Sequence, residues 1–450
     1  MSDPTAQMNA NKGGIQALLT NPDVSFWEYQ GYDATNIFVV DDLAKAEFLG
    51  KGIAQWNQTA TARLRKRGGR VYQTWLKLTI TNRAAPDAGV SAAWVDDLGA
   101  NLLEQVEVRY SSKEIHSYSG EALKFYQRIM DNDIVKESYN ALQLAGLPGV
   151  VGETIRAAYL SNAPSPLTTV DASGNFKIWI CLDWIWFTRE ARLALTTEAL
   201  SSEVEVRFKF RQLSELVYSR NAGAVPVNPW AVSGLPPVIA DMELVHQIVY
   251  TPVVETSNHL ARFETEEGLS FKTLDFSVQL ASELGNAASI YKVKLPNFRL
   301  DCQFIMFVVR DTRINVPWSI DRGSSDTTAT AFPGGGSING CLPIKRFRVT
   351  ANGSLLKDWM EEIENRALMR KLYFPGSQIA GYVYFIPFSE ALRDFLNVHG
   401  YQNLTNLGNL ELELDLNASP AGVLNRQCDA WSVDHNVIQQ ALGDIIRLQR

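Results

Sequence analysis

The chain lacks the segments that mark secreted and membrane proteins. Its N-terminus, MSDPTAQMNANKGG, has neither the basic start nor the apolar stretch of a secretory signal. The longest apolar runs, such as FIMFVV at 304–309, are strand-sized, far below the ~20 residues that span a bilayer. We therefore expect a soluble protein that is made in the cytosol.

Cysteine and histidine are also scarce. The four cysteines lie far apart without a CxxC pair, and the five histidines show no HExxH or other metal-ligand spacing. Neither a GxSxG elbow nor a complete phosphate-loop motif occurs. The sequence thus predicts no cofactor, no metal site and no enzymatic activity. In a reducing compartment we expect each cysteine to be a small buried apolar side chain; they are Cys181, Cys302, Cys341 and Cys428.

Positive charge is in deficit as well. Lys and Arg number 42 against 49 Asp and Glu, a net charge of −7, which argues against a protein that coats itself in nucleic acid or reads its sequence. What the chain has instead is length and aromatic side chains. Its 450 residues exceed what one hydrophobic core usually organises, and 11 Trp, 15 Tyr and 20 Phe favour β-sheet. We expect two sheet-rich domains.

Four segments of the first half have clear periodicity. Two alternate as half-buried strands, one has helical spacing with Ser119 available as N-cap, and one is too apolar to face water. In chain order they are the strand–turn LLEQVEVRYSSKEIHSY (102–118), the helix GEALKFYQRIMD (120–131), the buried strand FKIWICLDWIWF (176–187) and the alternating strand EVEVRFKF (203–210).

The second half repeats this order, which predicts tandem domains rather than a solenoid. Many strands at irregular spacing with few helices indicate antiparallel sandwiches. The repeated segments are the strand PIKRFRVTANG (343–353) with its Asn-Gly turn, the amphipathic helix SLLKDWMEEIENRALMRKLYF (354–374), the apolar strand GYVYFIPF (381–388) and the alternating strand NLELELDL (409–416).

Prolines indicate where the two domains meet. Pro226, Pro229, Pro236 and Pro237 prevent regular structure between residues 219 and 238. We therefore divide the chain into an N-terminal arm (1–24), a first domain (25–218), a linker (219–238) and a second domain with the C-terminal segment (239–450). The long connections 132–175 and 311–343 are expected to form functional surface.

Five stretches, in order, resemble the double jelly-roll major capsid proteins of nucleocytoplasmic large DNA viruses, virophages and polinton-like viruses. The first three are similar to the family's opening element with its aromatic strand, its strand–turn–helix, and its aromatic strand with the following corner and strand; the fourth lies in the second half, and the fifth is similar to the family's Asn-rich segment and C-terminal stretch. The stretches are NPDVSFWEYQGYDATNI (21–37), LGANLLEQVEVRYSSKEIHSYSGEAL (98–123), DWIWFTREARLALTTEALSSEVEVRFKF (183–210), NGSLLKDWMEEI (352–363) with GYVYFIPF (381–388), and HGYQNLTNLGNLELEL (399–414) with WSVDHNVIQQALG (431–443).

The resemblance implies an all-β fold of two tandem eight-stranded antiparallel jelly-roll sandwiches with short helices in the connections. It also implies a viral major capsid protein that forms a pseudo-hexagonal homotrimeric capsomer and tiles an icosahedral shell. Implied partners are the chain itself, penton proteins and minor capsid or cement proteins, with an internal membrane beneath. The protein would be synthesised and assembled inside the host cell and reside in the virion.

One basic segment stands out in this acidic chain, at TARLRKRGGR (61–70). It could meet anionic lipid or a scaffold protein on the inner face of the shell. The alternative is a solvated loop or strand edge whose charge prevents edge pairing. Its basic residues are Arg63, Arg65, Lys66, Arg67 and Arg70.

Two other functions compete with the capsid interpretation. A double jelly-roll enzyme that processes glycans would need converging carboxylates in a cleft between the domains. A carbohydrate-binding protein would need exposed tryptophans, for which Trp184, Trp186 and Trp230 are candidates; buried tryptophans would exclude that role.

Overall fold

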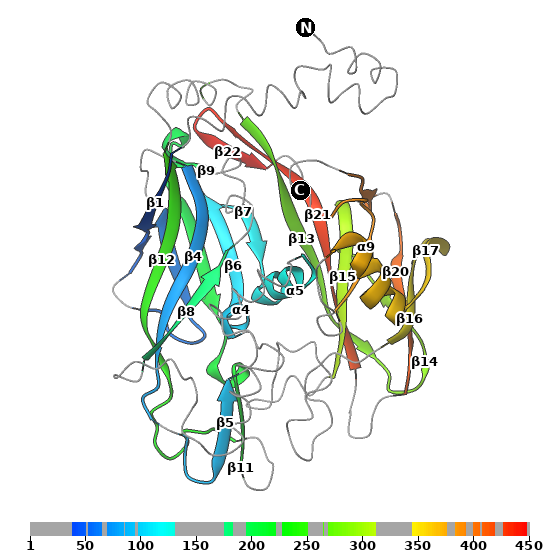
Figure 1. Cartoon of the computed structure of the whole chain (residues 1–450), viewed down its shortest axis with the longest axis horizontal. Coiled ribbons are helices and arrows are strands. Elements are labelled where there is room, and N and C mark those ends of the chain that lie inside the picture. Colours follow the sequence, from blue (N-terminus) through cyan, green and yellow to red (C-terminus); the bar gives the residue numbers. More distant parts are fainter. Residues whose placement is uncertain are drawn as a thin grey trace.

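The computed structural model describes residues 38–50, 53–64, 70–84, 86–94, 98–130, 175–182, 195–221, 227–250, 264, 269–311, 344–375, 383–392, 399–405, 407–418 and 426–447. These residues form two β-sandwiches that lie side by side, with one helix between them (Figure 1). Among them, no helix combines the length and apolar character needed to cross a bilayer.

The first sandwich consists of two antiparallel sheets. One has the strand order β1-β12-β4-β8, with β9 beside β4, and the other has the order β2-β3-β10-β6-β7. Strands of the first sheet are Phe38–Lys45 (β1), Val238–Tyr250 (β12), Arg70–Thr81 (β4), Asn175–Cys181 (β8) and Leu195–Thr196 (β9). Strands of the second are Glu47–Phe48 (β2), Thr59–Leu64 (β3), Val204–Phe210 (β10), Leu103–Tyr110 (β6) and Lys113–Tyr118 (β7).

The second sandwich has the same plan. Its sheets run β13-β21-β15-β18, with β19 beside β15 and β22 beside β21, and β14-β20-β16-β17. The first sheet contains Leu269–Leu284 (β13), Arg426–Ala441 (β21), Asp301–Asp311 (β15), Tyr384–Pro387 (β18), Gln402–Asn403 (β19) and Asp444–Arg447 (β22). The second contains Ser289–Lys294 (β14), Leu410–Leu416 (β20), Ile344–Ala351 (β16) and Ser354–Glu361 (β17).

The two sandwiches correspond strand by strand. Reading along the chain, β1, β3, β4, β6, β7, β8, β10 and β12 take the same sheet positions as β13, β14, β15, β16, β17, β18, β20 and β21. Even the two-residue strands β9 and β19 pair with corresponding strands, β4 and β15. Eight strands in two facing sheets are the arrangement of a jelly roll, so the predicted all-β fold of two tandem jelly rolls is confirmed.

The strand Val238–Tyr250 (β12) differs from the sequence-based division at residue 239. It pairs with β4 from Val238↔Thr81 to Val249↔Arg70 and with β1 on its other edge. It is therefore the last strand of the first sandwich, and the second sandwich begins with β13. The preceding ribbon, in which Val217–Asn221 (β11) pairs with Val90–Trp94 (β5), ends ahead of the prolines. The prolines do not separate the domains, because β12 still belongs to the first sandwich.

The helix predicted at 354–374 is wrong in its first half. Residues Ser354–Glu361 form β17, and the helical stretch begins only after this strand, at residues 362–363, and continues as Glu364–Met369 (η6, a π-helix) and Arg370–Tyr373 (α9). The cause is the preceding turn, since Asn352 (φ 51°) and Gly353 (φ 75°) both adopt the left-handed conformation that closes a two-residue hairpin. Ser111 (φ 48°) and Ser112 (φ 69°) close the equivalent hairpin β6–β7.

Two hydrophobic cores follow from strict alternation along the strands. In β10 the apolar side chains of Val204, Val206, Phe208 and Phe210 point inward and are buried. The core of the second sandwich holds Cys302 and Cys428 as buried thiols, and Cys181 is likewise buried. The predicted role of these three cysteines is confirmed, while Cys341 lies outside the described residues.

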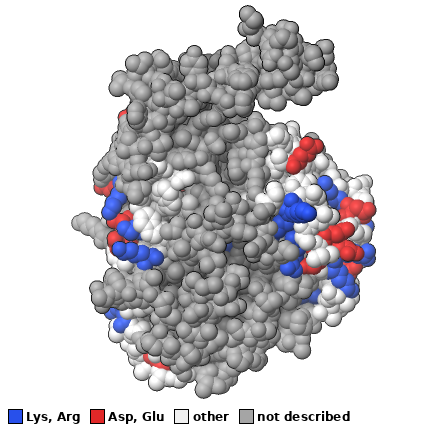
Figure 2. Space-filling model, in the orientation of Figure 1, with Lys and Arg blue, Asp and Glu red and all other residues white. Residues whose placement is uncertain are grey.

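Charges of both signs are mixed on the outer flank of the second sandwich (Figure 2). Lys292 lies 3.1 Å from Glu413 and 3.3 Å from Glu411 across strands β14 and β20. Arg348 on β16 forms a 2.8 Å ion pair with the same Glu413. Cross-strand pairs of opposite charge stabilise an exposed sheet modestly and leave no single-signed patch for a polyanion on this flank.

Candidate functional site: the junction between the two sandwiches

One helix, Gly120–Met130 (α5), lies at the centre of the junction (Figure 1). Ser119 caps it, because its Oγ accepts a hydrogen bond from the Ala122 amide at 3.2 Å. The first helical residue must be glycine, since a Cβ at Gly120 would overlap the carbonyl oxygens of Ala100 and Leu103. The preceding short helix Leu98–Leu102 (α4) is thus packed directly against the start of α5.

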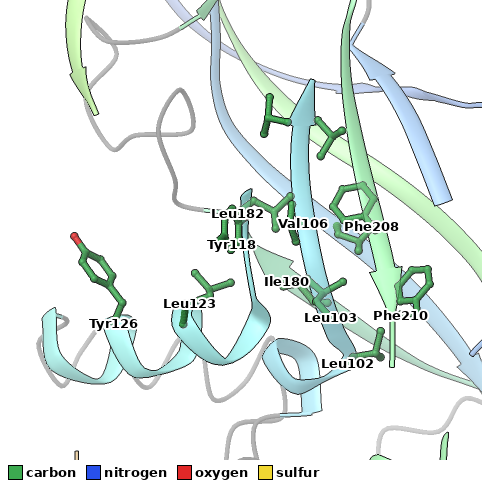
Figure 3. Close-up of a cluster of buried hydrophobic side chains, with 14 of the residues drawn as sticks. Leu102, Leu103, Val106, Tyr118, Leu123, Tyr126, Ile180, Leu182, Phe208 and Phe210 are labelled. Atoms are coloured by element: carbon green, nitrogen blue, oxygen red, sulfur yellow. The ribbon is translucent and has the colours of Figure 1, made fainter. Parts of the chain in front are cut away.

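The first side of α5 packs on its own sandwich. Leu123 points toward Tyr118 and Leu182, beside Ile180 of β8 (Figure 3). All of these side chains are buried in the core of the first sandwich. This side fixes the helix to the strands from which it emerges.

The other side of α5 packs on sheet β13-β21-β15-β18 of the second sandwich. The rings of Phe125 and Trp431 have centroids 5.2 Å apart. Tyr126 meets Phe276 edge-on at 6.0 Å and stacks on Phe304 at 6.2 Å. Since aromatic pairs in such geometries add to the gain from burial, α5 joins two sheets that belong to different sandwiches.

A buried ionic cluster crosses the same contact. The guanidinium group of Arg310, on β15, donates to both carboxylate oxygens of Glu121 on α5, at 3.2 and 3.3 Å. Its Nε lies 3.1 Å from Asp429 Oδ2 on β21, and Arg211 of the first sandwich approaches Glu121 at 3.6 Å. All four side chains are buried. Such a cluster defines one geometry, because any displacement would leave a buried charge unpaired.

Burial and charge act in opposite directions on Asp429. Burial raises the pKa of its carboxyl above the usual range, and the adjacent Arg310 lowers it. Arg310 also lies over the rings of Phe125, at 5.3 Å, and Trp431, at 5.9 Å. The guanidinium therefore makes charge and cation–π contacts with both sandwiches at once.

The C-terminal hairpin β21–β22 reaches the first sandwich at a second place. At its turn, the Gly443 carbonyl accepts hydrogen bonds from the Tyr110 hydroxyl and from the Ser201 amide, the latter at 2.8 Å. Gln440 Nε2 donates to the Thr196 carbonyl at 2.7 Å. We call this contact the C-terminal clasp.

A third contact joins β7 to β13. His116 Nδ1 lies 3.0 Å from Asp275 Oδ1, and both side chains are buried. The other oxygen of Asp275 accepts a hydrogen bond from Asn436 Nδ2 at 3.1 Å. Together with α5 and the clasp, this pair holds the two sandwiches in one fixed relation.

The basic segment predicted as an inner-face site is described only in part. Arg63 lies on β3, is exposed and forms ion pairs with Glu205 at 3.2 Å and Glu203 at 3.7 Å. Arg70 begins β4, but its side chain is outside the description, as are Arg65, Lys66 and Arg67. The one described member thus has its charge matched by neighbouring carboxylates.

Of the three tryptophans considered for sugar binding, the described one has a structural role. Trp230 is buried and donates from Nε1 to the Ala84 carbonyl at 3.1 Å, which excludes it as an exposed sugar platform. Trp184 and Trp186 lie outside the described residues. Among the described residues, Glu121 and Asp429 are two carboxylates that converge between the sandwiches, and both are buried against Arg310. A glycosidase acid pair must instead flank a substrate.

Sequence reasoning missed the ionic cluster. Glu121 lies in the predicted helix 120–131, Arg211 follows the predicted strand 203–210 and Arg310 follows the apolar run FIMFVV, but no spacing connects them along the chain. A charged residue at the end of an otherwise buried strand was the available signal. In the described part of the chain no three His, Cys, Asp or Glu side chains gather as metal ligands.

Comparison with known proteins gives matches of one kind. A family model described as the major capsid protein N-terminus matches residues 26–237. The major capsid protein of Phaeocystis pouchetii virus is 24% identical over 221 residues, covering 46% of this chain and 40% of that protein. That of Tipula iridescent virus is 23% identical over 225 residues, covering 47% of this chain and 46% of that protein. The match thus spans less than half of either relative's length.

Solved structures extend the likeness to almost the whole chain. PBCV-1 VP54, whose crystal structure was fitted into a reconstruction of the virophage Sputnik, aligns with a TM-score of 0.68 at 12% identity, covering 90% of this chain and 95% of that one. Faustovirus major capsid protein aligns with a TM-score of 0.63 at 12% identity, covering 96% of both chains. The shared fold and the family match confirm the resemblance that the sequence motifs indicate.

Proposed function

We propose that this chain is a major capsid protein of a large DNA virus or a relative of one, that it acts as a shell subunit and that it has no enzymatic activity. Three chains form a pseudo-hexagonal capsomer, and capsomers tile an icosahedral shell. The protein resides in the virion after synthesis and assembly in the host cell. Its partners are further copies of itself, penton proteins and minor capsid or cement proteins, and its inner face would meet an internal membrane where the virion has one.

The observation that carries this proposal is the repeat of one sandwich plan within a single, firmly joined chain. Two similar walls per chain give six similar walls around a threefold axis, so a trimer can occupy a near-hexagonal lattice without six identical subunits. This works only if the angle between the two walls is constant. The contacts at α5, Arg310 and the C-terminal clasp support a constant angle.

Light scattering of the purified chain at several concentrations tests the proposal. We expect a mass three times the 50.2 kDa of the chain that does not change with dilution. Electron microscopy of the same sample should show particles with six-sided outlines. A mass of one chain at every concentration would contradict the proposed capsomer.

A further inference from the structure

The helical segment of the second sandwich occupies the place that α5 occupies in the first. Each follows a two-residue hairpin, β6–β7 or β16–β17, and precedes the corresponding strand, β8 or β18. The η6–α9 segment also packs on its own sandwich. Asn365 exchanges two hydrogen bonds with the backbone of Phe385, and the rings of Phe374 and Phe385 lie 5.2 Å apart.

The outer side of this segment differs from that of α5. Ile363, Leu368 and Leu372 are 57%, 54% and 65% exposed. Their spacings of five and four residues match a π-turn followed by an α-turn, so the three side chains lie along one side. We call them the outer helix face. On α5, the corresponding apolar residues Phe125, Tyr126, Ile129 and Met130 are all buried.

The first sandwich has a surface equivalent to the one that α5 covers on the second sandwich. Sheet β1-β12-β4-β8 corresponds to β13-β21-β15-β18, the sheet that α5 covers. In β4, Leu76 and Leu78 point into the core, so Trp75 and Lys77 point outward. Trp75, Lys77 and Trp179 are half-buried, and Lys77 lies 5.2 Å from the Trp179 ring. We call this surface the outer sheet face.

We propose that the outer helix face docks on the outer sheet face of a second copy and so repeats between chains the contact that α5 makes within one chain. The argument rests on the proposed function for the number of copies and on the internal repeat for the surfaces. The contact is heterologous, because it joins two different surfaces. In the proposed capsomer of three copies, three contacts within chains then alternate with three contacts between chains around the ring.

The double variant Leu368→Asp/Leu372→Asp tests the helix side. Both residues are exposed, so folding should be unaffected, and we expect the native mass to fall from three chains to one. The matched control is Ile290→Asp/Leu355→Asp, which adds the same charge at residues that are 47% and 55% exposed elsewhere on the second sandwich. The control should remain a trimer.

Mixing two variants tests the pairing of the surfaces. Trp75→Ala/Trp179→Ala alters only the outer sheet face and should also be monomeric. An equal mixture with the helix variant should give dimers and no trimers, because only one intact helix face and one intact sheet face can meet. Circular dichroism checks that each variant is folded. If the tryptophan variant does not fold, the native masses of the helix variant and its control alone test whether the outer helix face is needed for the trimer.

The outcomes separate the two proposals. If the unaltered chain is a trimer and the helix variant also stays a trimer, the docking surface is wrong and the capsomer stands. If the two monomeric variants fail to form dimers, the helix does not dock on that sheet. If the unaltered chain is a monomer, both proposals fail.

Discussion

Helix α5 and the η6–α9 segment occupy equivalent places in the two sandwiches, yet their surroundings are opposite. Both sides of α5 are buried, one by its own sandwich and one by the sheet of the next. The η6–α9 segment is covered on one side, while Ile363, Leu368 and Leu372 remain exposed. Because α5 is covered by a neighbouring sheet, we infer that the exposed side of the equivalent η6–α9 segment is covered by a sheet of another chain.

The outer faces of the two equivalent sheets, β13-β21-β15-β18 and β1-β12-β4-β8, also differ: the first is buried and largely apolar, and the second carries charged side chains. The face that α5 covers presents Phe304, Met306 and Trp431, all buried. The equivalent face of the first sandwich presents Lys77 and Glu243, which form a 2.6 Å ion pair. A contact made within one chain during folding can be as apolar as a core, whereas a surface that waits for a partner must also tolerate water.

The largest effect should come from removing the buried ring at the centre of the junction. We expect Phe125→Ala to lower the free energy of unfolding by about 3–5 kcal/mol, because it leaves a cavity beside Trp431 and Arg310. At the equivalent helix, Leu368→Ala should change the stability of the single chain by no more than about 0.5 kcal/mol, because the side chain is already exposed.

Urea unfolding followed by tryptophan fluorescence measures both variants. Several chain concentrations separate the contribution of assembly, which depends on concentration, from that of the chain itself. If Phe125→Ala and Leu368→Ala lowered the free energy of unfolding equally at every concentration, the two helical segments would be equally important within the chain, and the contrast between them would be wrong.

Two buried acids, one at the junction and one in the second sandwich, have different partners. Asp429 has Arg310 at 3.1 Å, whereas Asp434 accepts hydrogen bonds from Ser277 and Ser432, both at 2.8 Å. Burial raises the pKa of Asp434 to about 6 from the ordinary 3.8. Burial also raises the pKa of Asp429, although the charge of Arg310 opposes this rise, and at Asp434 the hydrogen bonds from the two serine hydroxyls oppose it in the same way.

The sign of the resulting pH dependence follows from that pKa. As pH rises from about 4 to about 6, the unfolded chain releases the Asp434 proton and the folded chain retains it, so stability falls by at most about 3 kcal/mol. Above pH 6 this loss is complete. We expect Asp434→Asn to remove most of this decline, so that the variant gains stability relative to the unaltered chain as pH rises through this range.

Urea unfolding across that pH range measures the effect, with Asp429→Asn as the matched control. The control removes a partner of the buried Arg310 and should be destabilised even near neutral pH. Parallel stability curves for Asp434→Asn and the unaltered chain would show that Asp434 does not hold its proton above its ordinary pKa.

Much of the fold could be predicted from sequence because the signals are local. Alternation in EVEVRFKF gave β10, Ser119 and helical spacing gave α5, and the Asn-Gly pair gave the β16–β17 turn. The same turn explains the error at 354–361, since Leu355 and Trp359 have a spacing compatible with a helix. A hairpin partner decided the structure of that segment, and tertiary pairing is not visible in local periodicity.

The junction could not be predicted for the same reason. Glu121 and Arg310 are far apart in the chain, and neither has a neighbour that signals the other. Strand β12 was misassigned because prolines indicate a break in regular structure without indicating which sheet the next strand joins. The repeated order of segments correctly matched β6 with β16, β8 with β18 and β10 with β20, but it could not show that β12 closes the first sandwich.

Glycine at the C-terminal clasp provides a smaller test of how the sandwiches are joined. Gly443 has φ +74°, and a Cβ there would run into the Ser201 side chain. Gly234 has φ +62° with open space around the same position. The left-handed backbone costs an alanine about 1–2 kcal/mol at either site, and we expect Gly443→Ala to cost more because the clasp must also shift. If Gly443→Ala and Gly234→Ala lowered the thermal unfolding temperature equally, Ser201 could move aside from the added methyl group without a cost in stability.

The smallest effect should come from Arg63, the described member of the basic segment. Unlike Arg310, it is exposed, and its pairs with Glu205 and Glu203 compete with water and salt. We expect Arg63→Ala to lower the free energy of unfolding by about 0.2–1 kcal/mol in low salt and by less in high salt. Urea unfolding at both salt concentrations measures this difference. A large, salt-independent loss would place Arg63 with Arg310 among the residues that hold the fold, and would remove it as a candidate for contact with an anionic partner.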